Sequence, residues 1–335
     1  MAYDVKVKID LAKPIGQLGF GMPLILLENA AKEIPYTEVS GITDLAAAGI
    51  TKESNAYKAA NLLFAQKHAP ESIAVCAVTG PATDALADAK LVDKGWRHLI
   101  VVNDGETAST VQAISALVEA MEHKMYFAGL DVDDDTTITV TGLRRTVLFY
   151  CDATEDVPVP VAALVGETAG YAAGSITYKN TILTGIAAQD LTDAQIEAIH
   201  QKGGITFVAK AGDNVTSEGK VAGGEYIDVI DSEDYIIQQL TYRTQKVLNQ
   251  AAKVSYDNNG IGLLESVAKD VLQGAYNNGM IATNEDGSPA YWVDYALREN
   301  TKETDRANRK YIGGNFGFAL AGAIHTVEVT GTITV

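Results

Sequence analysis

The chain has 335 residues, of which 47% are hydrophobic and 21% are charged, and its formal net charge is −17. This composition excludes an intrinsically disordered chain, because it supplies enough apolar side chains for a core. The acidic balance argues against a general nucleic-acid binder and against an anionic membrane surface as partner, since both need a basic face. The length is enough for about two ordinary domains.

The sequence carries no signal for a membrane or for export. No uncharged apolar run reaches the roughly 18 residues that a membrane span requires, and residues 1–10 have no apolar stretch of the kind found in secretory signals. The two cysteines, Cys76 and Cys151, each lie beside apolar residues, so we expect buried free thiols. We therefore expect the chain to be made and folded in a cytoplasm.

Residues 1–12 predict a β-strand. Apolar and charged side chains alternate there, and Val5, Val7 and Ile9 share one face. Glycines and a proline follow, and we interpret the stretch GQLGFG at 16–21 as a hinge.

Between residues 23 and 190, short apolar runs alternate with segments of helical spacing. The runs predict strands at 23–28, 71–78, 98–102, 124–130, 144–151 and 181–188. The helical spacing predicts helices at 54–69, 81–95 and 107–123. Short strands that alternate with helices indicate an α/β layer with largely parallel strand pairing.

The pattern changes after residue 190. Thr192 and Gln195 are spaced as a capping box, which predicts a helix over 191–204. The next elements predicted are a β-hairpin within 205–231, amphipathic helices at 232–252 and 260–279, and a strand within 286–300.

The last 25 residues predict two strand segments with a bend between them. The apolar phase follows even positions from Phe316 to Ile324 and odd positions from Val327. A slip of one residue turns every side chain to the other face, so we expect a bend at His325–Thr326. Beyond it the predicted strand carries its apolar side chains on one face, at Val327, Val329, Ile333 and Val335.

No catalytic residue, cofactor site or metal site is predicted. The five histidines lie at no metal-ligand spacing from one another or from a cysteine, and His200 fits a helix end. The acidic run at 131–135 resembles the start of a calcium loop, but Thr136 and Gly142 stand where that loop needs Gly and Glu. The sequence also lacks the glycine patterns of phosphate-binding loops.

One local charge pattern stands out in this acidic chain. Lys302, Arg306 and Lys310 are spaced four residues apart, so on a helix they would form one basic stripe. Two interpretations stay open, a docking edge for an acidic partner and a solvated helix face with local ion pairs.

Three segments resemble the tail sheath proteins of contractile phage tails and R-type bacteriocins. They are ILTGIAAQDLTDAQIEAIHQKGGITFVAK (182–210), GGEYIDVIDSEDYIIQQLTYRTQKVLNQ (223–250) and NRKYIGGNFGFALAGAIHTVEVTGTITV (308–335). The likeness covers about 180–335 and, more weakly, the amino-terminal strand.

The resemblance implies a mixed α/β, multi-domain sheath subunit with extended β-strand arms. The expected parts are an N-terminal strand arm (1–18), an outer α/β domain (19–180), an inner C-terminal α/β domain (181–322) and a C-terminal strand arm (323–335). In this family the arms pair with sheets of neighbouring subunits, so the arm residues Val5, Val7, Ile9, Val327, Val329, Ile333 and Val335 are expected to make inter-subunit contacts.

The implied function is structural, with no enzyme activity and no cofactor. Subunits would polymerise helically around an inner tube and contract to drive the tube through a target envelope. The expected partners are other copies of the chain, the tail tube protein, and baseplate and tail terminator proteins, with no nucleic acid and no membrane insertion. Assembly is expected in the host bacterial cytoplasm and the final location in a virion tail or bacteriocin particle. The stripe Lys302, Arg306 and Lys310 would face the tube.

Two other functions remain open. One is a Rossmann-like α/β enzyme with a site at the strand ends near Asp104 and Thr79–Gly80. The other is a different self-assembling component of a virus or secretion machine.

Overall fold

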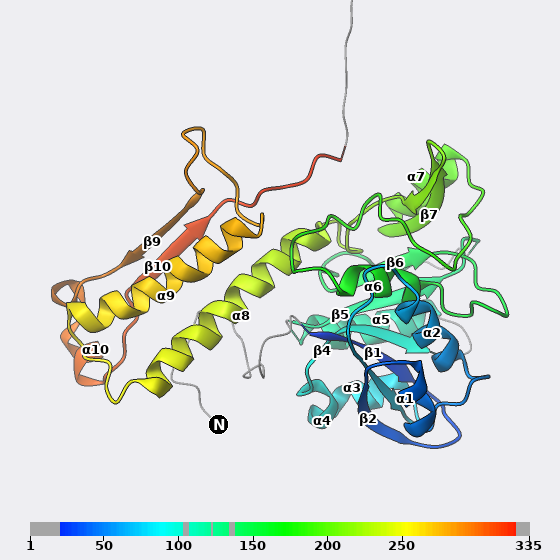
Figure 1. Ribbon diagram of the computed structural model, residues 1–335, viewed down its shortest axis with the longest axis horizontal. Coiled ribbons are helices and arrows are strands. Elements are labelled where there is room, and N and C mark those ends of the chain that lie inside the picture. Colours follow the sequence, from blue (N-terminus) through cyan, green and yellow to red (C-terminus); the bar gives the residue numbers. More distant parts are fainter. Residues whose placement is uncertain (1–20, 103–106, 122, 134–137, 326–335) are drawn as a thin grey trace, which may run out of the picture. The chain divides into compact units, whose positions relative to one another are not determined.

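The computed structural model describes residues 21–102, 107–121, 123–133 and 138–325. The chain divides into two compact units, of which the first ends at Gln245 and the second begins at Lys246 (Figure 1). Residues 204–216 extend the sheet of the first unit. The assignment of outer and inner domains stays a prediction.

The first unit is built on a mixed sheet. Its strands in the described residues are β1 (Met22–Leu27), β2 (Ile34–Val39), β3 (Ile73–Ala77), β4 (Trp96–Val102), β5 (Met125–Leu130), β6 (Thr146–Tyr150), β7 (Gly204–Lys210) and β8 (Asp213–Thr216). Their order is β2-β3-β1-β4-β5-β6-β7-β8, with parallel pairs from β3 to β7 and antiparallel pairs at both edges. The predicted, largely parallel pairing is confirmed.

Helices cover both faces of this sheet. The helices of the first unit are α1 (Ile42–Ala47), α2 (Asn55–Phe64), α3 (Ala82–Ala87), α4 (Ala89–Val92), α5 (Ala108–Glu119), α6 (Val161–Ala169), α7 (Asp193–Gln201) and most of α8 (Ile227–Gln250), whose last turn belongs to the second unit. One apolar core cluster joins the sheet to α1, α2 and α6 and to the start of α8, and a second joins it to α3, α4, α5 and α7. Strands β3, β4 and β6 are buried along their whole length because helices lie on both faces of the sheet.

Local capping explains where several helices begin. The Ser54 hydroxyl accepts a hydrogen bond from Tyr57 N at 3.2 Å at the start of α2. At α7 the Thr192 hydroxyl accepts from Gln195 N, and the Gln195 side chain accepts from Thr192 N at 3.0 Å. The predicted capping box is therefore confirmed.

Three local predictions differ from the structure. The single helix predicted at 81–95 is split into α3 and α4, because Asp88 is extended and its carboxylate accepts from Lys90 N. The strand predicted at 181–188 is wrong, since that range has a single isolated bridge, at Ile182, and Gly185 has a φ of 79°. Strand β2 was not predicted, because Pro35 interrupts its short and mixed pattern.

The second unit contains α9 (Asn258–Asn277), β9 (Tyr291–Tyr295), a 3₁₀ turn at Arg298–Asn300, α10 (Glu303–Ala307) and β10 (Gly314–Phe318). Strands β9 and β10 form an antiparallel pair that packs against α9. Along β9, Trp292 and Asp294 are exposed while their neighbours are half-buried, as a strand with one covered face requires. No helix among the described residues is both long and apolar enough to cross a membrane.

Candidate functional site

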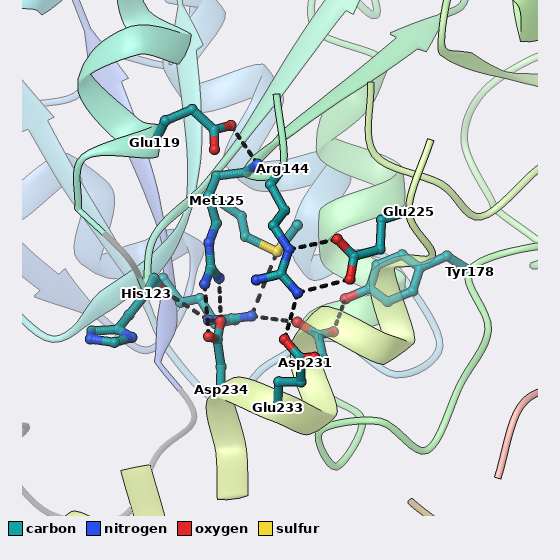
Figure 2. Close-up of polar contacts among 11 residues, drawn as sticks. Glu119, His123, Met125, Arg144, Tyr178, Glu225, Asp231, Glu233 and Asp234 are labelled. Carbon is teal, nitrogen blue, oxygen red and sulfur yellow. Dashed lines mark hydrogen bonds and ion pairs between the residues drawn. The ribbon is translucent and has the colours of Figure 1, made fainter. Parts of the chain in front are cut away.

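Four charged side chains are buried together between the large sheet and the beginning of α8 (Figure 2). We call them the buried charge cluster: Arg97, Arg145, Asp231 and Asp234. Arg97 belongs to β4, Arg145 directly precedes β6, and the two aspartates lie three residues apart on α8. Their exposed fractions are between 2% and 8%. A charge at such burial needs a partner of opposite sign.

The buried charge cluster supplies those partners. Arg97 Nη2 lies 2.5 Å from Asp231 Oδ1, and Arg97 Nη1 lies 2.8 Å from Asp234 Oδ2. Arg145 binds both oxygens of Asp234, with Nη2 2.9 Å from Oδ1. Charge-assisted bonds of this two-pronged kind are directional as well as strong.

The electrostatics of the two aspartates differ. Burial alone would raise the pKa of Asp234, but Arg97 and Arg145 hold it below its usual value. Burial raises the pKa of Asp231, although Arg97 and a hydrogen bond from Tyr178 oppose the shift. Asp234, with two arginines, is therefore the more firmly ionised of the pair.

Tyr178, in the loop between α6 and α7, is hydrogen-bonded to the buried charge cluster. The Tyr178 hydroxyl donates to Asp231 Oδ2 at 2.9 Å, and the Tyr178 carbonyl accepts from the Thr216 hydroxyl at 2.6 Å. Tyr178 has a φ of 59°, in the left-handed region that a bulky side chain rarely adopts. These contacts hold the residue in that conformation.

A second set of ion pairs lies nearer to solvent. Arg144 binds Glu225 through bonds of 2.5 Å and 2.8 Å, and it binds Glu233 at 2.5 Å. The Arg144 side chain is 40% exposed, so these pairs are screened by water and individually weak. Their contribution to stability can therefore be compared with that of the buried charge cluster.

The buried charge cluster lies at the amino-terminal ends of β4, β5 and β6. In α/β enzymes, ligands bind at the opposite, carboxyl-terminal edge. At that edge Glu28 follows β1 directly, and its carboxylate accepts from Ala82 N at 2.7 Å. The start of α3 is thus occupied by a side chain of the protein itself.

The residues considered for an enzyme site are only partly described. Thr79 donates from its hydroxyl to Glu33 Oε1 at 3.4 Å, and the Gly80 carbonyl accepts from Asn29 N at 3.0 Å. Asp104 lies outside the described residues. Among the described residues, no group of three or more His, Cys, Asp or Glu side chains is arranged to hold a metal ion.

The predicted arm residues cannot be placed. Val5, Val7, Ile9, Val327, Val329, Ile333 and Val335 lie outside the described residues. The hinge predicted at 16–21 and the bend predicted at His325–Thr326 also lie mainly or partly outside them. These assignments stay predictions.

The basic residues do not share one helix. Helix α10 covers only Glu303–Ala307, so Lys302 precedes it, and Lys310 follows a turn in which Arg309 has a φ of 54°. Lys302 and Lys310 are exposed, whereas Arg306 is half-buried and donates to the Thr301 carbonyl and, at 3.3 Å, to the Arg298 carbonyl. The role of these residues at a tube stays a prediction.

Other sequence predictions concern single residues. Cys76 and Cys151 are both buried free thiols, as expected. His200 lies in the last turn of α7, and its Nε2 is 2.9 Å from the Ser217 hydroxyl. His98, which sequence reasoning did not single out, is buried beside Arg97, and its pKa is lowered to about 3, mainly by burial.

The buried charge cluster was missed at the sequence level, although a signal exists. Arg97 lies within β4, two residues before the apolar run Leu99–Val102. Asp231 and Asp234 share the helix face of buried Ile227, Ile230 and Ile237, where an apolar side chain is the ordinary choice. Ionisable residues on an apolar face indicate buried partners of opposite charge.

Comparisons of structure identify proteins of the same fold. The helical sheath of the anti-feeding prophage in its contracted state has a TM-score of 0.74 and 15% identity, with 98% of each chain covered. The contracted sheath of PVC, an extracellular contractile injection system, has a TM-score of 0.73 and 11% identity, with 99% of this chain and 96% of that chain covered. A sheath tail protein from Desulfitobacterium hafniense has a TM-score of 0.57 and 10% identity, with 94% of this chain and 99% of that chain covered.

Comparisons of sequence agree for the C-terminal part. The family model described as E217 tail sheath protein gp31-like, C-terminal domain, matches residues 227–333. A search of curated proteins gave no match. The resemblance to tail sheath proteins is thereby confirmed: the chain has the fold of sheath proteins, and its residues 227–333 match the family model of the E217 tail sheath gp31-like C-terminal domain.

Proposed function

We propose that this chain is the structural subunit of a contractile tail sheath. The observation that carries the proposal is the fold match to a contracted helical sheath, which extends over 98% of both chains. A match of this extent covers both compact units, and the family match at 227–333 supports it independently for the C-terminal part. A sheath subunit acts by assembly, so its function lies in its surfaces.

The subunits polymerise around an inner tube by adding strands to one another. The strand patterns at 1–12 and 327–335 support this part of the proposal, because each carries apolar side chains on one face only. Backbone hydrogen bonds between strands supply affinity, and alternate side chains fix the register. The acceptor is a sheet in a neighbouring copy.

Contraction is a rearrangement of subunit bodies that drives the tube through a target envelope. Added burial of apolar surface between subunits favours the short state, so the process needs no nucleotide. The subunit assembles in the host bacterial cytoplasm and ends in a phage tail, bacteriocin or related particle. Baseplate and tail terminator proteins limit the polymer at its two ends.

The exposed basic residues Lys302 and Lys310, together with Arg306, contact the tube. The charges of the two units support this assignment. The first unit holds 18 lysines and arginines against 33 aspartates and glutamates, whereas the second holds 8 against 10. Residues 298–310 carry five basic and three acidic side chains. Individually weak surface pairs suit a sheath that must release its tube.

The enzyme alternative is less well supported. Glu28 occupies the start of α3, at the edge where an α/β enzyme of this type would bind a ligand. No observation favours a particular substrate.

Negative-stain electron microscopy of the purified full-length chain over a concentration series tests the proposal. Hollow cylinders or stacked rings that grow with concentration are the expected result. Small discrete particles at every concentration, also after addition of the tube protein from the same source, would contradict it.

A further inference from the structure

Helix α8 is the covalent connection between the two units. It begins at Ile227 in the first unit, and the boundary between Gln245 and Lys246 lies inside it. The part of α8 before this boundary packs within the first unit, and its direction relative to the large sheet is a property of that unit alone.

Two different parts of the sheet hold the same stretch of α8. Arg97 comes from β4 and Arg145 from the residue before β6, and β5 lies between these strands. Both guanidinium groups bind Asp234, and Arg97 also binds Asp231. Figure 2 shows Asp231 and Asp234 on the first turns of α8, with the Tyr178 hydroxyl directed at Asp231. Rotation or tilt of α8 would separate at least one buried pair.

Tyr178 adds a third point of attachment. Its hydroxyl reaches Asp231 from a loop between α6 and α7, which is neither strand nor α8. Apolar contacts alone would tolerate sliding of the helix, because burial of apolar surface has no preferred direction. Hydrogen bonds and ion pairs are directional, and Arg97, Arg145 and Tyr178 direct theirs at Asp231 and Asp234 from three separate places in the first unit.

We propose that the buried charge cluster, with Tyr178, fixes the direction of α8 relative to the large sheet. One consequence rests on the proposed sheath function. When the large sheet rotates during contraction, α8 rotates with it, because the helix cannot bend where it contacts the sheet. Arg97, Arg145, Asp231 and Asp234 are then positioning residues of the sheath subunit.

Pulsed electron paramagnetic resonance on the isolated chain tests the proposal. Spin labels at Glu71→Cys, before β3, and Arg243→Cys, on α8, report the direction of the helix within the first unit. Both positions are exposed, and Cys76 and Cys151 are buried, which directs labelling to the introduced cysteines. The chain without further substitution is expected to give one narrow distance distribution.

The decisive variant replaces the buried charge cluster by apolar residues: Arg97→Met, Arg145→Met, Asp231→Leu and Asp234→Leu. Its fold can be retained, because apolar side chains of similar volume often replace buried ion pairs without loss of stability. We expect its distance distribution to widen about twofold at unchanged circular dichroism. The control Arg144→Met removes the exposed ion pairs to Glu225 and Glu233 and is expected to leave the distribution narrow.

A narrow distribution in the folded apolar variant would overturn the proposal. If that variant does not fold, Arg145→Lys decides, because it keeps the charge and loses the two-pronged geometry. A wider distribution for Arg145→Lys supports the proposal, and an unchanged one overturns it. The measurement needs no assembled sheath. Failure of the anchoring proposal is therefore distinguishable from failure of the sheath function, which shows only in the assembly assay.

Discussion

Arg145 and Asp234 form a two-bond, buried ion pair although 89 residues separate them in the sequence. The pair joins the residue before β6 to α8, and Arg97, from β4, binds the same aspartate. The start of α8 is therefore held to the sheet by directional charges in addition to apolar packing. Several consequences of this arrangement can be measured.

Removing one partner from the buried charge cluster should destabilise the first unit strongly. Asp234→Ala leaves the buried Arg145 without its carboxylate partner and removes one of the two carboxylates that bind Arg97, so we expect a loss of about 3–5 kcal/mol in the free energy of unfolding. The matched control Arg144→Ala removes exposed pairs, and its expected loss is about 0–1 kcal/mol. Urea denaturation monitored by circular dichroism measures both losses. Equal losses for the two variants would show that the buried pairs contribute no more to stability than the exposed ones.

Stability should fall in mild acid because of His98. Burial lowers the pKa of His98 to about 3, whereas the unfolded chain protonates it near a pKa of about 6.5. Below the unfolded value the unfolded state binds a proton that the folded state excludes. Stability is therefore fully present above about pH 6.5 and is lost as the pH falls toward 3, by at most about 1.4 kcal/mol per pH unit for this group.

The variant His98→Leu should weaken this acid dependence. Part of the dependence is expected to remain, because His123 also has a lowered pKa, of about 4, mainly through burial. Unfolding midpoints in urea between pH 4 and pH 7 give the slope for each protein. The same slope in the variant and the unsubstituted chain would show that His98 is not responsible.

Close packing between α2 and α6 should make Gly166 intolerant of a side chain. A Cβ atom there would lie 2.4 Å from the Leu63 carbonyl oxygen, which belongs to the backbone and cannot turn away. Gly166→Ala is expected to cost about 1–3 kcal/mol through overpacking. In α9, Gly274 has no atom within 4 Å of the same position, so Gly274→Ala should stabilise by about 0.5–1 kcal/mol. Thermal unfolding that shifts both variants in the same direction would contradict this reading.

Elements with local signals could be predicted from the sequence, whereas the buried charge cluster could not. Thr192 and Gln195, three residues apart, form the capping box that predicts the start of α7. The periodic spacing of apolar residues predicts α8 and α9. Asp231 forms its ion pair with Arg97, 134 residues away, and no local pattern connects the two residues. The basic stripe failed as a helical feature for a similar reason: spacing alone could not show that α10 ends at Ala307.

Reversing exposed basic charges in the second unit should impair binding to the tube and spare the fold. Lys302→Glu with Lys310→Glu changes two exposed side chains and leaves the hydrogen bonds of Arg306 in place. We expect reduced co-sedimentation with tube protein, more clearly at low salt because surface charges are screened. Lys32→Glu with Lys52→Glu, two exposed lysines of the first unit, is the matched control. Unchanged co-sedimentation of the first variant would leave these residues as solvated surface.

Deletion of residues 325–335 tests the central claim of assembly by strand addition most directly. Electron microscopy and sedimentation would compare the truncated and full-length chains at equal concentration, with circular dichroism as the check on folding. The account predicts a folded, soluble subunit that no longer polymerises, because the C-terminal arm is missing. Regular tubes formed by the truncated chain would contradict it.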